Sequence, residues 1–201
     1  MIKAEKQKNA LIYAIEQYPQ IGRTKLMKFV FLVDLFAFNT CGEPLLEDEY
    51  KRLQNGPVPS YGFANTDSTN NLFRITKEPC DPERIIYQYV PKEKADMSSF
   101  KTDEIRLFDK ILLCLKNHKT EEISELTHRF NLWKKASNNA IIPIEDLKLD
   151  DYEYDELESF IYYTNAVAEA KQLNNYPDTD SGDSVPEDLV IIQFQTMCGD
   201  N

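Results

Sequence analysis

The stretch from Thr24 to Cys41 constrains the fold more than any other part of the sequence. Apolar residues follow a three-and-four spacing along one face, and further apolar residues fill the flanks. The face holds Leu26, Phe29, Val30, Val33, Phe36 and Ala37, and the flanks hold Phe31, Leu32, Leu35 and Phe38. A helix that is apolar nearly all round belongs in the centre of a core. We therefore expect a central helix that starts at a Thr24 cap, ends near Gly42 and has the other elements packed around it.

The remaining sequence predicts more helices and a small amount of β-structure. Helical spacing and capping residues mark the helices, with caps expected at Thr102 or a neighbouring serine and at Thr120. β-Branched and aromatic residues between prolines mark a short hairpin. The expected helices are 3–18, 102–119, 120–128 and 154–173, the hairpin is 72–76 with 84–90, and 50–53 and 55–59 form an ordered loop or very short strand. The predicted fold is α+β, predominantly α-helical, with a small β-hairpin or sheet, in a single compact domain over residues 1–173.

The acidic charge is densest in the C-terminal segment 174–201. This segment holds six of the 34 acidic residues and none of the 23 Lys and Arg residues. Its polar composition buries too little apolar area to offset the entropy of ordering, so we expect a flexible tail. A short apolar end segment at 189–197 fits a helix, a strand or disorder. The formal net charge of −11 opposes binding to a phosphate backbone, so nucleic acid is not an expected partner.

The sequence predicts a cytoplasmic protein. No apolar run approaches about 20 residues, and charged residues interrupt the N-terminus, so neither a membrane span nor a secretion signal is expected. The four cysteines are far apart and lack the spacing of a zinc site. We expect four reduced thiols in a reducing compartment and no cofactor.

The motifs of the common enzyme classes are missing from the sequence. There is no G-x-S-x-G, P-loop or G-x-G-x-x-G motif, and the two histidines leave few ways to build a triad. His128, five residues before Trp133, is interpreted as an orienting hydrogen-bond residue. The acids at 150–158 lack calcium-loop spacing and fit a helix start, where negative charge favours the dipole. We expect no catalytic residue, metal site or enzyme activity; a small hydrolase or transferase using His128 with a carboxylate or Cys114 is the rival hypothesis.

Three charged residues in the apolar helix need an explanation. Lys25 and Lys28 lie near its expected N-terminus, where positive charge is unfavourable. Either their stems pack while their heads reach solvent or pair with an acid such as Asp34 or Glu49, or they form a basic recognition spot. Burial of the Asp34 carboxylate without a partner would cost folding free energy, so we expect an ion pair or polar contacts around it.

Several short segments follow one another along the chain. They are Lys25–Asp34 (KLMKFVFLVD), Gly42–Leu45 (GEPL), Asp48–Tyr50 (DEY), Asn55–Pro59 (NGPVP), Ile105–Leu115 (IRLFDKILLCL), Leu126–His128 (LTH) and Trp133–Ala136 (WKKA). In this order and spacing they resemble the Panacea (SocA-like) antitoxin family. The resemblance covers about residues 1–173. The family usually has a tyrosine where this chain has Phe31, so no polar role is expected there.

The resemblance implies a bacterial or phage antitoxin that binds its cognate toxin directly. The alternative that it implies is a SocA-like adaptor that delivers the toxin to a cytosolic AAA+ protease, for which the tail is a candidate contact. The expected docking surface surrounds the loop 42–60 and the start of the central helix, with buried aromatic anchors and acidic segments that complement a basic toxin. The candidate partner-binding residues are Lys25, Lys28, Asp34, Glu43, Tyr50, Asn55, Gly56, Pro57, Tyr61, His128 and Trp133.

Overall fold

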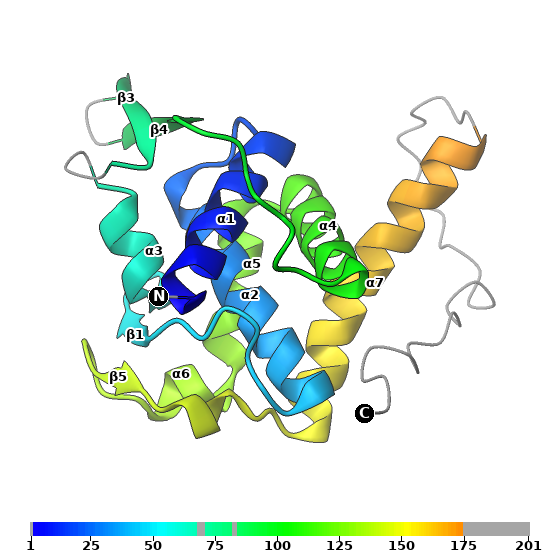
Figure 1. The fold of residues 1–201 in the computed structure, drawn as a ribbon. Coiled ribbons are helices and arrows are strands. Elements are labelled where there is room, and N and C mark those ends of the chain that lie inside the picture. The colour runs from blue at the N-terminus through cyan, green and yellow to red at the C-terminus, as the bar shows by residue number, and fades with distance from the viewer. Residues whose placement is uncertain (1, 68–70, 82–83, 175–201) are drawn as a thin grey trace.

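Helix α2 (Arg23–Cys41) runs through the centre of the computed structural model, which describes residues 2–67, 71–81 and 84–174. Every residue from Leu26 to Ala37 is buried, as a helix that is apolar all round requires. Helices α1 (Ile2–Gln17) and α4 (Thr102–Asn117) both contact it (Figure 1). The predicted central helix is therefore confirmed.

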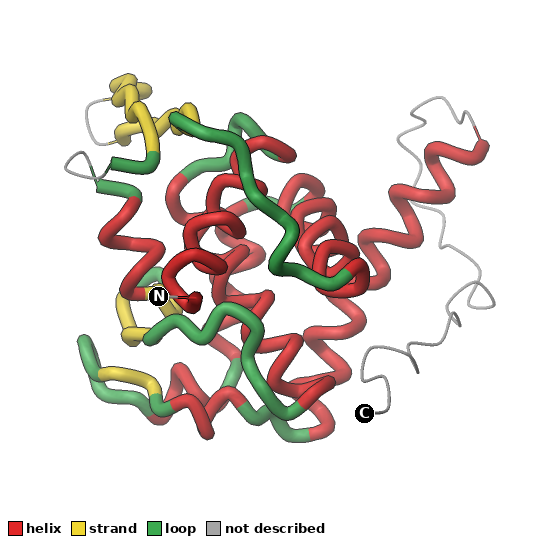
Figure 2. The backbone as a smooth tube through the Cα atoms, viewed as in Figure 1, coloured by secondary structure: helices red, strands yellow, loops and turns green. Residues whose placement is uncertain are grey.

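Four further helices and a single 3-10 turn complete the helical part of the described chain. They are α3 (Ser60–Asn65), α5 (Thr120–Arg129), α6 (Asn131–Lys135), α7 (Asp151–Asn174) and η1 (Ile144–Leu147). Helix α7 packs along α4 and then extends past the body of the molecule, whereas α5 contacts the central helix and is followed directly by α6, which packs on α5 (Figure 1). Helices dominate the backbone, with strands confined to one side (Figure 2), so the predicted α+β, mainly helical class is confirmed.

The strands form two small antiparallel sheets. One has the order β2-β1-β5, from β2 (Gly56–Pro59), β1 (Tyr50–Leu53) and β5 (Ile141–Ile142). Its β2 strand contains two prolines, which is compatible with its place at the edge of the sheet. The other sheet is the hairpin of β3 (Phe73–Asp81) and β4 (Arg84–Pro91), which is longer than predicted. Both the hairpin and the very short strand at 56–59 are confirmed.

The predicted threonine caps are wrong by one or two positions. Helix α2 has Gly22 at its N-cap, and α4 and α5 have Lys101 and Lys119. The carboxylates of Glu104 and Glu122 accept the backbone N–H of those two lysines at 2.7 Å. A glutamate at the third position therefore satisfies the helix start, and the threonine becomes the first helical residue.

The predicted tail lies outside the described residues apart from Asn174, the last residue of α7. The same holds for its apolar end segment at 189–197. Within the described ranges, no helix has both the length and the apolarity needed to cross a bilayer.

Candidate functional site

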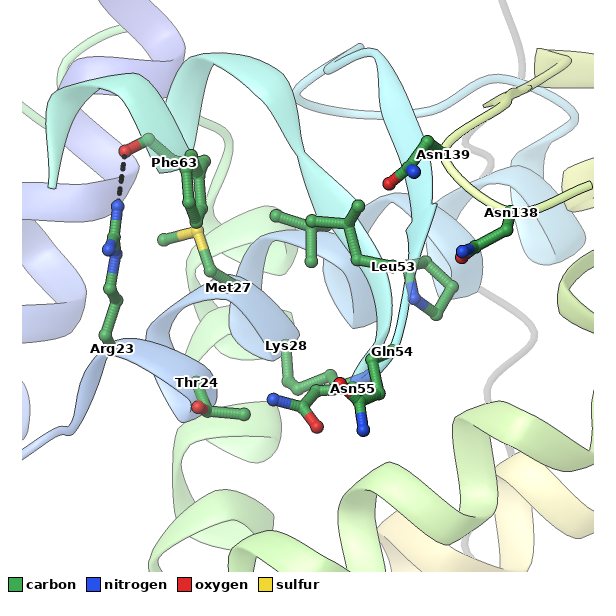
Figure 3. Close-up of a pocket in the computed structure, with 12 residues that line it drawn as sticks. Arg23, Thr24, Met27, Lys28, Leu53, Gln54, Asn55, Phe63, Asn138 and Asn139 are labelled. Carbon is green, nitrogen blue, oxygen red and sulfur yellow. Dashed lines mark hydrogen bonds between the residues drawn. The ribbon is translucent and has the colours of Figure 1, made fainter. Parts of the chain in front are cut away.

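A pocket of about 500 Å³ opens between the start of α2, the β1–β2 turn, α3 and the loop before β5 (Figure 3). Its walls combine apolar side chains, amides and two cations. The lining residues are Arg23, Thr24, Met27, Lys28, Leu53, Gln54, Asn55, Pro57, Val58, Phe63, Asn138 and Asn139. They come from four separate parts of the sequence, so the pocket exists only in the folded chain.

Lys28 is a buried cation in this lining. Its side chain is 1% exposed, and Nζ donates a hydrogen bond to Thr127 Oγ1 at 2.6 Å. Burial lowers the pKa of the Lys28 amine to about 7. Thr127 is a neutral partner, so among the described residues no carboxylate bonds to this amine.

Gly56 makes room for the Lys28 amine. Its φ of 105° is unfavourable for any residue with a side chain. A Cβ built on Gly56 would lie 2.0 Å from Lys28 Nζ and 2.7 Å from Thr127 Oγ1. The glycine of the β1–β2 turn is therefore required both by the backbone conformation and by the close approach of the lysine.

Trp133 ties the β1–β2 hairpin to the α5–α6 segment. Its Nε1 donates to the Leu53 carbonyl at 3.1 Å, and its own carbonyl accepts from Arg52 Nε at 3.1 Å. The His128 ring stacks on the indole with centroids 4.0 Å apart, and the Arg52 guanidinium lies 4.1 Å from it. Burial, followed by the charges of Lys28 and Arg52, lowers the pKa of His128. These contacts hold the α5–α6 segment against the hairpin beside the pocket and place the Arg52 charge next to the indole.

Asp34 organises the loop that leads into the hairpin. Its carboxylate accepts the backbone N–H groups of Leu46 and Asp48 and the hydroxyl of Tyr50, the last at 2.6 Å. Burial raises the pKa of Asp34 to about 6, although these hydrogen bonds oppose the rise. The expected polar contacts are confirmed. Phe31 packs edge-on against the Tyr50 ring, at 5.3 Å, and makes an apolar contact there.

A second buried carboxylate, Asp48, positions α3 at the pocket. It accepts the backbone N–H groups of Tyr61 and Gly62 at 3.0 and 3.1 Å, which satisfies the start of this short helix. Phe63 is thereby placed on the pocket wall, where the Arg23 guanidinium lies 3.9 Å from its ring and donates to its carbonyl. Phe63 is 42% exposed, so an aromatic face is available to a partner.

Lys25 lies outside the pocket and has a structural contact. Its Nζ donates to the carbonyls of Leu115 and His118 at 2.6 and 2.7 Å, at the C-terminus of α4. A cation is favoured there by the helix dipole, which explains its position. Pairing of Lys25 or Lys28 with Asp34 or Glu49, one of the alternatives from the sequence, is wrong.

A family model spans most of the residues that line the pocket. Residues 26–134, more than half of the chain, match the model of the antitoxin SocA-like, Panacea domain family. The chain belongs to this family. No curated protein and no solved structure matches it.

Part of the predicted partner-binding set gathers around the pocket. Lys28, Asn55 and Pro57 line it, Gly56 abuts Lys28, and Trp133 stacks on His128 and donates to the lining residue Leu53 without lining the pocket itself. The structure does not bring the other predicted residues to the lining. Lys25 and Tyr61 are half-buried elsewhere, Glu43 is exposed on the loop after α2, and Asp34 and Tyr50 are in the core.

Sequence reasoning missed several lining residues. Arg23 precedes the matched segment, and Asn138 and Asn139 follow it. Asn139 has a positive φ of 61°, and an asparagine pair in a loop is the signal that marks such a conformation. No sequence pattern marks Phe63 as a pocket residue, because an exposed aromatic side chain cannot be distinguished from a core one by sequence alone.

The Cys114–His128 pair of the rival enzyme hypothesis is not formed. Cys114 is buried in α4, and its Sγ lies 3.7 Å from Nδ1 of His118, one turn later. The acids at 150–158 form the start of α7, where Asp150 Oδ1 accepts the N–H of Glu153 at 2.9 Å. In the described parts of the chain, no cluster of His, Cys, Asp and Glu side chains is arranged to hold a metal ion.

Proposed function

We propose that this Panacea protein is an antitoxin that neutralises a cognate toxin by binding it directly, on the face that carries the Lys28 pocket. The observation that supports this proposal is the convergence of family segments at one open pocket: Lys28 and residues of the 55–59 segment line it, and the 126–133 segment contacts lining residues through the Thr127–Lys28 and Trp133–Leu53 hydrogen bonds. On this proposal the chain acts in the cytoplasm, without catalysis or a cofactor, and with no nucleic acid as partner.

The pocket face has the properties of a protein-binding surface. Buried aromatic and arginine anchors contribute most of the affinity of typical interfaces. Phe63 and Arg23 lie together in the pocket lining, and Arg52 and Trp133 pack on each other at the β1–β2 hairpin, whose turn lines the pocket. Hydrogen bonds to the backbone hold Trp133 and Arg52 in place, so little side-chain entropy remains to be lost when a partner binds.

The charge of the chain favours a basic toxin. With a net charge of −11, association with a basic protein is accelerated by long-range attraction, and the on-rate falls as salt is added. The acidic start of α7 and the acidic tail segment 174–201 are the candidate regions for this steering.

Co-expression with the toxin encoded beside it tests the proposal. Phe63→Ala removes an exposed ring at the pocket, and Tyr163→Ala is a matched control that removes a 59% exposed ring on α7, beyond its acidic start. We expect Phe63→Ala to lose toxin binding by about 10-fold or more, and Tyr163→Ala to bind as the unmodified chain does. Persistent toxicity in the presence of folded, unmodified protein would show that direct neutralisation is wrong.

Removal of residues after Leu173 separates direct binding from delivery to an AAA+ protease. Direct binding through the pocket face predicts that the shortened chain still neutralises the toxin and that toxin levels stay constant. Degradation of the toxin in the presence of the full chain, lost together with neutralisation in the shortened chain, would favour the adaptor function instead, because the tail would then be needed for degradation.

A further inference from the structure

The charge of the pocket lining is opposite to that of the chain. The lining contains two cations, Arg23 and Lys28, and no acidic residue. The chain as a whole has 34 acids against 23 bases, so a lining without an acid differs from the average surface. Positive charge in a recess is focused by the low-dielectric walls and attracts anions.

Of the two cations, Lys28 is the more deeply buried and makes the fewer hydrogen bonds. The Arg23 guanidinium already donates to Thr66 Oγ1 and to the Phe63 carbonyl. An ammonium has three donors, and the Lys28 amine has a single hydrogen bond to the described residues, to the neutral Thr127 hydroxyl. A buried cation without a counterion is costly, and an anion in the adjoining pocket would reduce that cost.

The other lining residues fit a ligand with two chemical parts. The amides of Asn55, Asn138 and Asn139 offer N–H donors, and Figure 3 shows the Lys28 side chain extending toward Asn55. Met27, Leu53, Pro57, Val58 and Phe63 supply an apolar wall. A volume of about 500 Å³ is larger than a bare carboxylate needs, so there is space for an apolar group as well.

We propose that the Lys28 pocket binds a carboxylate carried on an apolar body, and that in the antitoxin complex this is an acidic side chain of the toxin beside an apolar residue. The identity of the ligand rests on the proposed function. The anion site itself does not, because it is built from this chain alone.

The anion site can be tested on the full chain without the toxin. Hexanoate, its uncharged analogue hexanamide and inorganic phosphate are titrated separately at constant ionic strength, and the backbone amide resonances of Gln54, Asn55 and Gly56 are followed by NMR. We expect hexanoate to shift these resonances and to bind at least about 10-fold more tightly than hexanamide or phosphate. Equal binding of hexanoate and hexanamide would overturn the anion site, and equal binding of phosphate would overturn the apolar part.

Matched variants place the effect in the pocket. Lys28→Met removes the charge, and we expect hexanoate affinity to fall about 10-fold. Asn55→Asp adds a carboxylate at an exposed position of the lining and leaves the core untouched, so it keeps the test informative if Lys28→Met perturbs the fold. Asn117→Asp makes the same change on α4, away from the pocket, and is expected to bind hexanoate normally. Equal weakening by both aspartates would attribute the effect to net charge and overturn the site.

The last part of the test measures binding of the toxin to the same variants. If the pocket receives an acidic side chain of the toxin, Asn55→Asp weakens the complex and hexanoate competes with the toxin, whereas Asn117→Asp does neither. Hexanoate binding without any effect on the complex would show that the pocket serves a free organic anion and would overturn the assignment to the toxin. A failure of toxin binding by the unmodified chain would instead contradict the proposed function and leave the hexanoate result standing.

Discussion

The two buried charges of α2 have opposite environments. Asp34 is fully buried and accepts hydrogen bonds from two backbone N–H groups and the Tyr50 hydroxyl, so its carboxylate is well solvated by the protein. Lys28 lies nearly two turns earlier, is almost as deeply buried and bonds to one neutral hydroxyl. Asp34 faces the interior, where it fixes the 46–50 loop, and Lys28 lines an open pocket.

This difference separates a structural charge from a candidate functional one. A buried charge whose hydrogen bonds are satisfied can stabilise a fold, whereas one that lacks a counterion usually lowers stability. The comparison predicts opposite signs for the removal of the two charges, with the largest effect at Asp34.

Asp34→Ala is expected to cost about 4 kcal/mol of unfolding free energy, because it leaves buried N–H and hydroxyl donors without an acceptor. Chemical denaturation of both proteins measures the loss. Tyr50→Phe is the graded control: it removes one of the three hydrogen bonds and should cost about 1 kcal/mol. A loss below about 1 kcal/mol for Asp34→Ala would contradict the scaffold role.

Lys28→Met is expected to raise the unfolding free energy by about 2 kcal/mol, since a side chain of similar length replaces a poorly compensated buried charge. The Thr127 hydroxyl keeps its hydrogen bond to the Ser124 carbonyl, so the substitution leaves this donor with an acceptor. The same denaturation experiment measures the change. Destabilisation by Lys28→Met would mean that the lysine is a structural residue and that the contrast with Asp34 fails.

The stability difference between Lys28→Met and the unmodified chain should depend on pH. The pKa of Lys28 is about 7 in the folded chain, against 10.5 for an ordinary lysine, so below pH 7 both states are protonated and the full cost of burial is present. As pH rises from about 7 to 10, the folded state loses its proton first and the unmodified chain gains stability. The gap should therefore close by up to about 2 kcal/mol, measured by denaturation of both proteins at each pH. A gap that stays constant would contradict a buried amine that titrates near neutral pH.

Lys25→Met is expected to change the unfolding free energy least, and it compares two lysines of the same helix. Lys25 donates to two carbonyls at the end of α4, so its loss should cost about 1 kcal/mol, opposite in sign to Lys28→Met three residues later. Thermal unfolding of the three proteins side by side measures both shifts. The same sign for both lysines would show that charge at the start of α2, rather than the individual contacts, determines stability.

Local patterns were sufficient to predict most of the secondary structure. The apolar residues of α2, the β-branched residues of the β3–β4 hairpin and the prolines around it each act over a few neighbours, so they could be interpreted without the fold. The errors occurred where two local signals competed. Thr102 and Thr120 are good capping residues, but Glu104 and Glu122 satisfy the helix starts from within the first turn.

The sequence by itself determined the central helix, the mainly helical fold class and the family, because these depend on short patterns and their order. Only the tertiary structure decided which charged residue is structural and which lines a pocket. Lys25, Lys28 and Asp34 share one helix and equivalent local surroundings, and their roles follow from α4, α5 and the 46–50 loop. Charge costs depend on solvation and on partners distant in sequence, which no local pattern encodes.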